Sequence, residues 1–348
     1  MSLASRKLRI GVPPSLAALA PQTSVGRIWR NVLEGLADLG ARVRIAEPTL
    51  RRRRIDVWLT DGHQGALEVR APVVAHLHEA TWADPALRAL VEPAFIAAYE
   101  RPSAEAAGAS RRLITLSHSS QQQIVAAYGR DPEEVHVVPP GVDHGIYRRG
   151  LDPPGPLVAA AGGEALRPYV LFVSVVHPRK NLVVLREAMA GLAARGFPHA
   201  LVLVAGPAAD RADSRALASA ATAPIPGVVA PVVNLAGAAD ADVARLMAGA
   251  AAFCLPSLME GFGMAVAEAM ACGAPVVVSD RGALPEVVGD AGIAVAPTAP
   301  AIESALADVL GHPLQARELS ARAVARAAAY RWDRTAAGFL AVLEAATA

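Results

Sequence analysis

The sequence predicts an α/β protein with two domains, each built on a parallel β-sheet that helices cover on both faces. Three observations support this prediction. The chain has 348 residues, which is more than a single hydrophobic core normally serves. Short β-branched runs alternate with longer helical patterns from end to end. A segment rich in Gly and Pro interrupts the alternation near the middle of the chain, and the pattern then starts again.

The first domain is expected at residues 1–150. Apolar side chains at helical spacing indicate a long first helix, which Gly40 ends. These side chains are Ile28, Val32, Leu33, Leu36 and Leu39. Strands are expected at residues 8–12, 42–46, 55–59, 72–76, 111–116 and 135–138. Helical stretches between several of these strands favour a parallel sheet.

Residues 150–168 have no clear period and are interpreted as the linker. The second domain is expected at residues 165–330. Its strands are expected at 169–176, 200–205, 232–237, 251–256 and 275–279, and its helices at 181–195, 241–250 and 264–272. Two or three more helices are expected between residues 300 and 348. Because ligands bind at the carboxyl ends of such strands, two facing sheets would form a cleft between the domains.

Composition excludes several classes of protein. The 33 Lys and Arg nearly balance the 32 Asp and Glu, which argues against a general nucleic-acid-binding protein. The basic run Arg51–Arg54 is interpreted as a solvated loop, with contact to anionic lipid or a polyanionic acceptor left open. Cys254 and Cys272 lack metal-ligand spacing and fit a reducing, cytoplasmic compartment. The sequence shows neither a signal peptide nor a run of about 18 apolar residues that would span a membrane.

The most informative segment is residues 256–292. A strand that ends at Pro256 leads through the loop 260–263 (EGFG) into a helix that carries Glu268. The backbone N–H groups at such a helix start suit a phosphate, because the glycines leave room for its approach. Glu268 lies about one and a half turns further on, where a carboxylate can accept hydrogen bonds from ribose hydroxyls. Glu260 is placed to contact the group beyond the phosphates. Taken alone, the segment is equally a strand–turn–helix with two solvated glutamates.

A second segment, residues 173–188, ends a strand and places Arg179 and Lys180 just before a helix. Two cations at the carboxyl end of a strand can neutralise a diphosphate leaving group. A solvated basic turn is the alternative for this pair of residues.

Together these segments resemble glycosyltransferase family 4, whose members are retaining GT-B enzymes. Residues 256–292 are similar to the E-x7-E signature of the family, and residues 173–188 to its EPRKNL type of phosphate-binding turn. Residues 232–257 resemble the strand, Gly turn and helix before that signature, and residues 113–143 resemble the family's N-terminal domain. The resemblance covers most of the chain. It implies a GT-B fold, with two Rossmann-like domains whose parallel sheets face each other across a cleft.

For the second domain, the resemblance implies a site for the nucleotide-sugar donor. Glu260 matches the glutamate that contacts the hydroxyls of the donor sugar, and Glu268 matches the ribose-binding glutamate. Lys180 matches the diphosphate-binding lysine, with Arg179 beside it. The backbone amides that approach sugar or phosphate match those of Phe262, Gly263 and Met264. The family's VGR strand end is replaced here by residues 173–175 (VSV), so the usual cation is missing or replaced by Arg179.

For the first domain, the resemblance implies an acceptor site. Residues 73–80 are similar to the family's strand that ends in HD, so that His78 matches the active-site histidine. Gly26 and Arg27 match the GxGR region at the start of the first long helix. A solvated residue in the first helical turn is the alternative for Arg27.

Two patterns resemble metal motifs. His76 and His78 form an H-x-H pair that is expected on one strand face. No third ligand is evident, and a buried, hydrogen-bonded histidine is the stronger interpretation. Asp240 and Asp242 form a D-x-D, where acids are expected to cap the start of a helix and complement its dipole. No metal site is therefore predicted.

The C-terminal segment, residues 334–348, is expected to return to the first domain. Residues 330–333 (YRWD) resemble the family's turn before its last helix, and Asp333 can cap that helix. A row at helical spacing follows on one side of it, formed by Ala337, Leu340, Ala341 and Glu344.

The resemblance implies a metal-independent hexosyltransferase that needs no cofactor besides its donor. A hexose would move from a nucleotide-diphosphate sugar to an acceptor with retained anomeric configuration, and Arg179 and Lys180 would stabilise the leaving diphosphate. GDP- and UDP-linked hexoses are the family's donors, and the EPRKN type of turn favours GDP-mannose. The acceptor, whether carbohydrate, lipid-linked or a small molecule, is not readable from the sequence, and nucleic acid is not an expected partner.

Two other functions stay open: a GT-B nucleotide-sugar epimerase and a catalytically silent GT-B scaffold subunit. The joint presence of Lys180, Glu260 and Glu268 argues against the silent scaffold. The expected setting is bacterial glycan biosynthesis in the cytoplasm, with a peripheral position at the inner face of the membrane left open.

Overall fold

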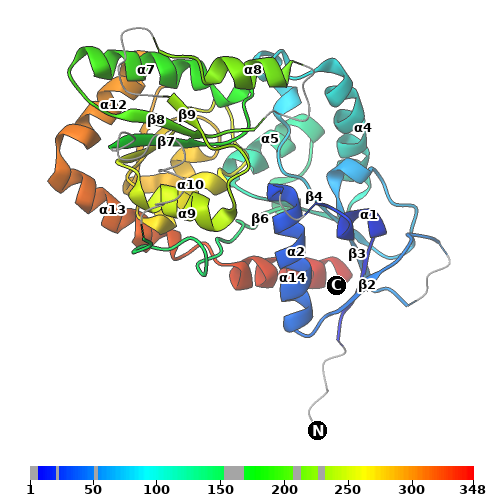
Figure 1. Cartoon of the computed structure of the whole chain (residues 1–348). Helices are drawn as coiled ribbons and strands as arrows, with labels where there is room; N and C mark the ends of the chain where they lie inside the picture. The colour runs from blue at the N-terminus through cyan, green and yellow to red at the C-terminus, as the bar shows by residue number, and fades with distance from the viewer. Residues whose placement is uncertain (1–6, 21–22, 51–53, 153–167, 207–212, 226–231) are drawn as a thin grey trace. The chain divides into compact units, whose positions relative to one another are not determined.

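The computed structural model describes residues 7–20, 23–50, 54–152, 168–206, 213–225 and 232–348 (Figure 1). The chain forms two compact units. Unit 1 consists of Met1–Arg88, Pro93–Gly141 and Tyr330–Ala348, and unit 2 consists of Ala89–Glu92 and Val142–Ala329. Most of the expected linker, residues 153–167, and Arg51–Arg53 of the basic run lie outside the described residues.

Unit 1 is built on a six-stranded parallel sheet with the strand order β2-β1-β3-β4-β5-β6. Its strands are β1 (Arg9–Val12), β2 (Arg42–Ile45), β3 (Val57–Asp61), β4 (Val73–His76), β5 (Arg112–Thr115) and β6 (Val135–Val137). Its helices are α1 (Pro14–Ala17), α2 (Ser24–Asp38), α3 (Pro85–Arg88), α4 (Pro93–Ala109), α5 (His118–Tyr128) and α14 (Trp332–Thr347). Short 3₁₀ turns are η1 (Gly62–Gln64), η2 (Thr81–Ala83) and η3 (Pro132–Glu134). All side chains of β3 and β4 are buried, as expected for central strands that are covered on both faces.

Helix α14 lies beside α2 and also contacts β3, β4 and β5 (Figure 1). Gly35 allows the two helices to approach closely, because a Cβ at that position would lie 2.5 Å from the Cβ of Ala336. Thr335 Oγ1 donates a hydrogen bond to the carbonyl of Pro139 at 2.8 Å. The buried side of α14 consists of Thr335, Ala336, Phe339, Val342, Leu343 and Ala346.

Two expected details of this helix are wrong. Its outer side, which is exposed or half-buried, carries the row expected to pack: Ala337, Leu340, Ala341 and Glu344. Asp333 is not the cap, because the helix begins at Trp332 after Arg331 and no side chain caps it. Asp333 instead lies in the first turn and forms an ion pair with Arg331 at 2.8 Å.

Unit 2 is built on a second six-stranded parallel sheet, with the strand order β12-β11-β10-β7-β8-β9. Its strands are β7 (Tyr169–Val173), β8 (Ala200–Val204), β9 (Val232–Asn234), β10 (Ala252–Leu255), β11 (Val276–Ser279) and β12 (Ile293–Val295). Its helices are α7 (Leu182–Ala194), α8 (Ser214–Ala221), α9 (Asp240–Gly249), α10 (Met264–Cys272), α11 (Leu284–Val288), α12 (Ala299–Gly311) and α13 (Pro313–Ala327). The 3₁₀ turns are η5 (Pro178–Lys180) and η6 (Gly289–Ala291). In Figure 1, α7 and α8 run along one side of the strands, and α9 and α10 lie on the other.

The winding of each sheet reverses once, and the reversal marks where ligands bind. In unit 2, β8 and β9 are added on one side of β7, and β10 then starts again on the other side. In unit 1, β2 and β3 flank β1 in the same way. Crevices in doubly wound sheets open at such reversals, outside the carboxyl ends of the two strands. Functional residues are therefore expected after β7 and β10 and after β1 and β3.

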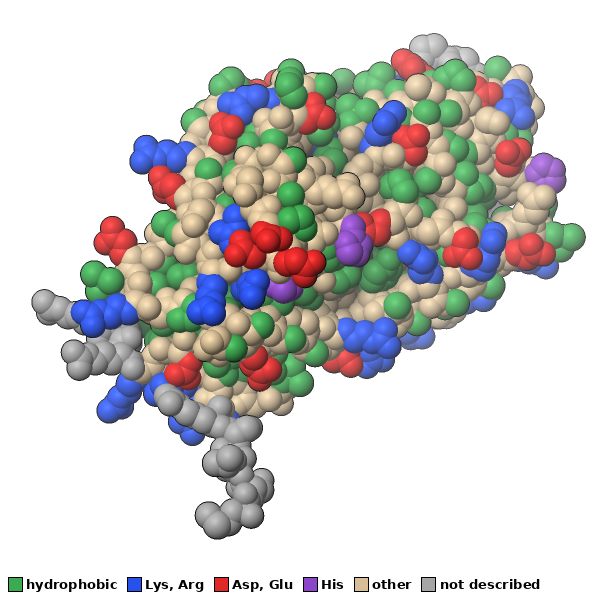
Figure 2. Space-filling model, turned by 180° about the vertical axis from the view of Figure 1, so that it is seen from behind, with side chains coloured by type: hydrophobic (Ala, Val, Ile, Leu, Met, Phe, Trp, Pro, Cys, Tyr) green, Lys and Arg blue, Asp and Glu red, His purple; other side chains and the backbone are tan. Residues whose placement is uncertain are grey.

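Several strands differ from the sequence expectation, and β7 and β9 each end three residues earlier than expected. β3 ends at Asp61, beyond the expected end at residue 59. β12 was not expected, because a three-residue strand is too short to show a period. No helix in the described part of the chain is both long and apolar enough to span a membrane. On the face drawn in Figure 2, Lys and Arg side chains are interspersed with Asp and Glu, in line with the near balance of charge.

Phe339→Ala should lower the free energy of unfolding of unit 1 by about 3–5 kcal/mol, because it opens a cavity where α14 covers the sheet. Phe339 is fully buried, and its ring centroid lies 6.2 Å from that of Trp29 and 5.4 Å from that of His76. Urea unfolding followed by Trp fluorescence measures this loss, since all 4 Trp residues belong to unit 1. Leu340→Ala on the outer side is the matched control, and its loss should be about 1 kcal/mol or less. Equal losses in both variants would contradict the prediction.

Candidate functional site

Two loops meet at the carboxyl ends of β7 and β10, where the winding of the unit 2 sheet reverses. The turn after β7 continues into η5, and the loop after β10 spans residues 256–263. Leu258 donates its N–H to the carbonyl of Arg179 at 2.8 Å. The Arg179 guanidinium donates in turn to the carbonyl of Met259 at 2.6 Å. The two segments singled out in the sequence therefore form one site.

Asn181 holds the turn after β7 in place. It lies in the left-handed region with a φ of 56°, which no other non-Gly residue in the described part of the chain does. Its side-chain amide donates to the carbonyls of Pro256 and Pro297, each at 3.2 Å. Asn tolerates this conformation better than most residues, but it still costs on the order of 1 kcal/mol. The surrounding hydrogen bonds offset that cost, so the turn is rigidly placed.

Lys180 and Glu260 form a buried ion pair where the two loops meet. Lys180 Nζ donates to both oxygens of the Glu260 carboxylate, at 2.7 and 2.9 Å. Ser257 Oγ donates to the same carboxylate at 2.6 Å. Lys180 is 9% exposed and Glu260 is 7% exposed. The alternatives of a solvated basic turn and a solvated glutamate are therefore wrong for these two residues.

The electrostatics of this pair keep Glu260 ionised. Burial raises the pKa of Glu260, but the charges of Lys180 and Arg179 and the hydrogen bonds from Lys180 and Ser257 outweigh that effect. The net result is a pKa below the usual value of a glutamate. An anionic ligand that approaches Lys180 must therefore share the ammonium group with a carboxylate that is already bound to it.

Arg179 is the more accessible of the two cations. Its side chain is 21% exposed, against 11% for Lys180, and its Nη1 atom lies 3.7 Å from Glu260 Oε2. His177 Nδ1 accepts the N–H of Arg179 at 3.0 Å and so caps the start of η5. The guanidinium is thus held at the edge of the site by a backbone that is itself hydrogen-bonded.

Helix α10 begins directly after the second loop, with Gly263 as its N-cap at a φ of 96°. Two features exclude a side chain at this position. The φ value disfavours residues other than Gly, and a Cβ would lie 2.7 Å from Leu284 Cδ2. No side chain caps this helix start. Phe262 is buried, and Gly263 and Met264 are half-buried. The start of α10 therefore has the form expected of an anion-binding helix terminus.

Glu268 lies further along α10 and is only 4% exposed. A buried carboxylate needs hydrogen-bonding or charged partners, so this residue is not the solvated helix glutamate of the alternative interpretation. Its contact with a ribose stays a prediction.

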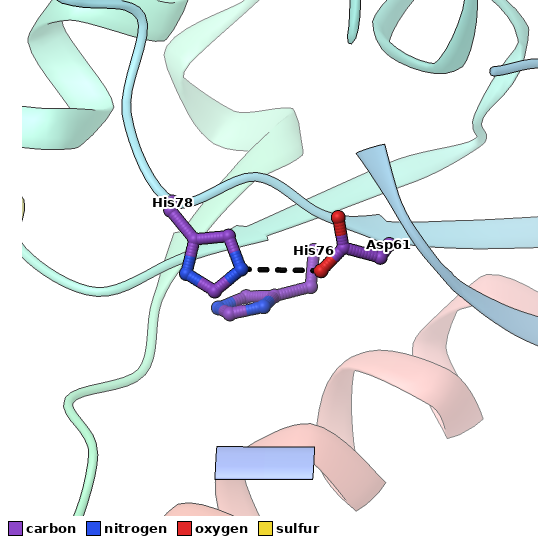
Figure 3. A group of neighbouring side chains, drawn as sticks. All are labelled: Asp61, His76 and His78. Carbon is purple, nitrogen blue, oxygen red and sulfur yellow. Dashed lines mark hydrogen bonds and ion pairs between the residues drawn. The ribbon is translucent and has the colours of Figure 1, made fainter. Parts of the chain in front are cut away.

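A second group of polar residues lies at the strand ends of unit 1. Asp61 ends β3 and His76 ends β4, and the two residues are register partners in the sheet. Asp61 Oδ2 accepts a hydrogen bond from Trp29 Nε1 at 3.0 Å and lies 3.1 Å from His78 Nε2 (Figure 3). The ring centroids of His76 and His78 are 4.4 Å apart. His63 also belongs to the group, with Nδ1 3.2 Å from Asp61 Oδ1.

Burial and mutual charge set the ionisation of this group. Burial raises the pKa of Asp61, but the hydrogen bond with His78 and the charges of His78, His63 and His76 bring it well below the usual value. Burial first, and then the charge of His78, hold the pKa of His76 well below its usual value. Burial also lowers the pKa of His63, although the charge of Asp61 opposes it. Asp61 is therefore ionised at neutral pH, and burial favours the neutral forms of His63 and His76.

Two expectations about the histidines are wrong. His78 lies beyond the end of β4, so the H-x-H pair is not on one strand face. His76 is buried but not hydrogen-bonded, because neither ring nitrogen has a partner among the described residues. The sequence analysis also missed Asp61, which lies beside both histidines. If the end of β3 had been predicted at residue 61, the Asp61 carboxylate would have been expected at the same sheet edge as His76.

Gly26 and Arg27 lie in the first turn of α2, in unit 1. Gly26 is buried, and a Cβ on it would collide with the carbonyl oxygen of Ala20. Close packing of the preceding loop is therefore one reason for this glycine. Arg27 is half-buried, so it is not the fully solvated residue of the alternative.

The D-x-D pattern lies at the start of α9. Asp240 and Asp242 are in the first turn, but the N-cap is Ala239 and no side chain caps it, so the expected capping is wrong. Asp242 instead pairs with Arg245 at 3.4 Å. Both acids still complement the dipole of the helix.

The two cysteines are free and buried. Burial, and then the charge of Glu268, raise the pKa of Cys272 to about 12. Burial also raises the pKa of Cys254. Both are therefore neutral thiols that act as small apolar residues.

Comparison with known families finds one match in each half of the chain. Residues 167–312 match the family described as Glycosyl transferases group 1, and residues 25–145 match Glycosyltransferase Family 4. Each of the two segments is thus similar to a glycosyltransferase domain. The residues around Lys180, Glu260 and Glu268 all fall within the group 1 match.

Curated relatives are similar in sequence over about two thirds of the chain. A D-inositol 3-phosphate glycosyltransferase of Segniliparus rotundus is 34% identical over 243 residues, which cover 68% of this chain and 53% of the relative. An MMP alpha-(1->4)-mannosyltransferase of Mycolicibacterium hassiacum is 32% identical over 241 residues, with coverages of 68% and 54%. The match thus spans about half the length of these relatives.

Solved structures share the fold. Sucrose-phosphate synthase from Thermosynechococcus elongatus has a TM-score of 0.74 at 17% identity and covers 97% of this chain and 99% of its own. Anabaena HepE in complex with UDP and glucose has a TM-score of 0.72 at 16% identity, with coverages of 97% and 100%. Together with the two six-stranded parallel sheets, these likenesses identify a two-domain GT-B fold.

Lys180→Met should destabilise unit 2 by about 3–5 kcal/mol, because it leaves the Glu260 carboxylate buried without its cation. A lysine in a solvated basic turn could instead be replaced with little loss of stability. Adding Glu260→Gln should recover most of the loss, because the double variant buries two neutral groups. Thermal unfolding followed by circular dichroism measures both effects.

The matched control for this pair is Arg245→Gln, which breaks the exposed pair with Asp242 and should change stability by about 0.5 kcal/mol or less. If the double variant were as unstable as Lys180→Met alone, the pair would not be the source of the effect.

Proposed function

We propose that this protein is a retaining glycosyltransferase that moves a hexose from a nucleotide-diphosphate sugar to an acceptor. The observation that carries the proposal is the buried pair of Lys180 and Glu260, with Arg179 beside it, at the carboxyl ends of β7 and β10. This arrangement lies inside the segment that matches the group 1 glycosyltransferases. It provides cations, an anion-binding helix start and a carboxylate within one site.

Each group in unit 2 has a proposed task. Arg179 and Lys180 stabilise the diphosphate that leaves, and the backbone N–H groups at the start of α10 add partial positive charge. Glu260 accepts hydrogen bonds from hydroxyls of the donor sugar, and Glu268 binds the ribose. Lys180 connects diphosphate binding with recognition of the donor sugar, because the ammonium group that orients Glu260 is also proposed to bind the phosphate.

In unit 1, His78 is the proposed active-site histidine, and Asp61 orients it. The carboxylate of Asp61 lies 3.1 Å from His78 Nε2, so it selects the tautomer with the proton on Nε2. Nδ1 of His78 is then the basic atom of the ring. Gly26 and Arg27, at the start of α2, are proposed to contact the substrate as the resemblance to family 4 implies.

The proposed donor is a GDP- or UDP-linked hexose, with GDP-mannose favoured by the PRKN turn. One relative that is 32% identical carries the name of a mannosyltransferase, which agrees with this preference. Front-face attack with retention of configuration is the proposed course, as the resemblance to family 4 implies. Arg179 and Lys180 would stabilise the leaving group, so no metal is needed for that task.

The experiment that tests this function incubates the protein with GDP-, UDP- and ADP-linked hexoses and measures the released nucleotide, with and without candidate acceptors. A glycosyltransferase releases nucleotide and forms a product whose anomeric proton shows retention by NMR. Release without any sugar transfer would favour an epimerase or hydrolase. Neither release nor binding with any donor would contradict the proposal.

The variant Lys180→Met/Glu260→Gln should fold but release nucleotide about 100-fold more slowly than the wild type. It restores the balance of buried charge while it removes the charge that stabilises the leaving diphosphate, which is worth about 3 kcal/mol at such sites. Steady-state nucleotide release measures the change, and Arg245→Gln serves again as the control. Near-normal turnover in the folded double variant would show that Lys180 and Glu260 have no part in the reaction.

Excess chelator should not lower nucleotide release, because Arg179 and Lys180 supply the positive charge that Mg²⁺ supplies at other diphosphate sites. The measurement compares initial rates before and after treatment with EDTA and removal of the chelate by gel filtration. A loss of activity that a divalent ion restores would contradict metal-independent departure of the diphosphate.

A further inference from the structure

Asp61, His76 and His78 bring three potential metal ligands together at one edge of the unit 1 sheet (Figure 3). Each residue offers one ligand atom, and these atoms all lie within 4.8 Å of one another. The sheet itself creates the group, because Asp61 and His76 are register partners at the ends of two adjacent parallel strands. The turn η1 after β3 packs closely against the residue that follows β4, since a Cβ on Gly62 would lie 2.8 Å from Leu77 Cγ.

His76 is the residue that indicates a ligand. It is fully buried, and neither of its ring nitrogens has a hydrogen-bond partner among the described residues. Its ring lies against the aromatic rings of Trp29 and Phe339, at centroid distances of 5.5 and 5.4 Å. These neighbours offer no hydrogen bond through their carbon edges. An unsatisfied buried polar group costs about 1–3 kcal/mol, and a bound cation would offset that cost by accepting a nitrogen lone pair.

Asp61 is already oriented as a metal-binding carboxylate would be. Trp29 Nε1 donates to Oδ2 at 3.0 Å, and the N–H of His63 donates to Oδ1 at 3.0 Å. Such outer hydrogen bonds fix the direction of a ligating carboxylate and are a regular part of metal sites. Asp61 is 3% exposed, so its negative charge lies in a region of low dielectric constant, where its attraction to a nearby cation is strong.

We propose that Asp61, His76 and His78 bind a divalent transition-metal ion of the zinc class. Two imidazoles and one carboxylate suit Zn²⁺, Co²⁺ or Ni²⁺, whereas Mg²⁺ and Ca²⁺ prefer oxygen ligands alone. Three protein ligands leave one position of a tetrahedral zinc ion for water or for His63, whose Nδ1 is 3.2 Å from Asp61 Oδ1.

Binding requires a small movement of the ligands. Tetrahedral zinc at about 2.05 Å from each ligand atom places those atoms about 3.3 Å apart, so the widest pair must contract by at most about 1.5 Å. His78 is the ligand with room to move, because its side chain is 13% exposed and it lies beyond the end of β4. Its Nε2 atom would exchange the contact with Asp61 for one with the metal.

Metal binding and the pairing of Asp61 with His78 therefore exclude each other. If His78 acts in glycosyl transfer, the metal-bound form is the less active one, and this consequence rests on the proposed function. The binding site itself does not, because it is defined by three residues of unit 1.

The test uses the full chain after treatment with chelator and gel filtration. Titration with Co²⁺ should produce visible absorption bands that saturate at one ion per chain, and Zn²⁺ should displace the bands. Isothermal titration with Zn²⁺ should give the same stoichiometry, and Zn²⁺ should raise the melting temperature of the wild type. Mg²⁺ should neither produce heat at the same concentration nor compete with Co²⁺.

Two variants localise the binding. His76→Phe keeps an aromatic ring in the apolar surroundings, and Asp61→Asn keeps the shape of the acid. Each should bind Zn²⁺ about 10-fold or more weakly than the wild type, since even outer-shell changes have effects of that size. The control is His118→Gln, which removes an exposed histidine from the start of α5 and should bind as the wild type does.

Circular dichroism shows which variants fold, and a variant that does not fold is replaced by His78→Gln. Absence of Co²⁺ bands and of Zn²⁺ heat in the wild type overturns the proposal. Unchanged affinity in the folded variants overturns it as well, because the metal then binds elsewhere. These readouts do not depend on turnover, so they are independent of whether the glycosyltransferase proposal holds.

Discussion

The buried pair of Lys180 and Glu260 is the interaction on which the candidate donor site depends. It joins the turn after β7 to the loop after β10, where the winding of the sheet reverses. Burial of two charges costs several kcal/mol unless other groups support them. Ser257 supplies such support by donating to the carboxylate, and its own carbonyl accepts a hydrogen bond from Ser279 on β11. Three neighbouring strand ends are thus held by one chain of polar contacts, and the site is ordered before any ligand arrives.

Unit 1 uses the same architectural place for different chemistry. Asp61 and His76 also lie at the ends of adjacent strands, next to a reversal in strand order. The two sites differ in the groups that surround the carboxylate. Glu260 faces an ammonium group and a guanidinium, whereas Asp61 faces imidazoles and an indole N–H. A carboxylate without a permanent cation beside it attracts a positively charged ligand. For this physical reason the two strand-end sites are suited to ligands of different charge.

Local patterns in the sequence were sufficient for the two sheets, most strand positions and the two loop segments, because periodicity and Gly or Pro punctuation are local signals. The contact between Lys180 and Glu260 was not readable, since 80 residues separate them and only the strand order brings them together. Asp61 was missed because β3 continues past its apolar run. The packing side of α14 was misjudged because small apolar alanines occur on both sides of that helix, so the spacing alone does not tell one side from the other.

The return of α14 to unit 1 has a consequence for how the protein is made. Unit 1 is assembled from segments on either side of unit 2 in the chain, and α14 leaves the ribosome after the last strand of unit 2. Until then, the apolar surface formed by Trp29, His76 and their neighbours is without its cover, Phe339. The nascent chain therefore carries an incomplete N-terminal core through most of its synthesis. Unit 2 has no such dependence, because all of its residues precede α14, so its core can be completed before that of unit 1.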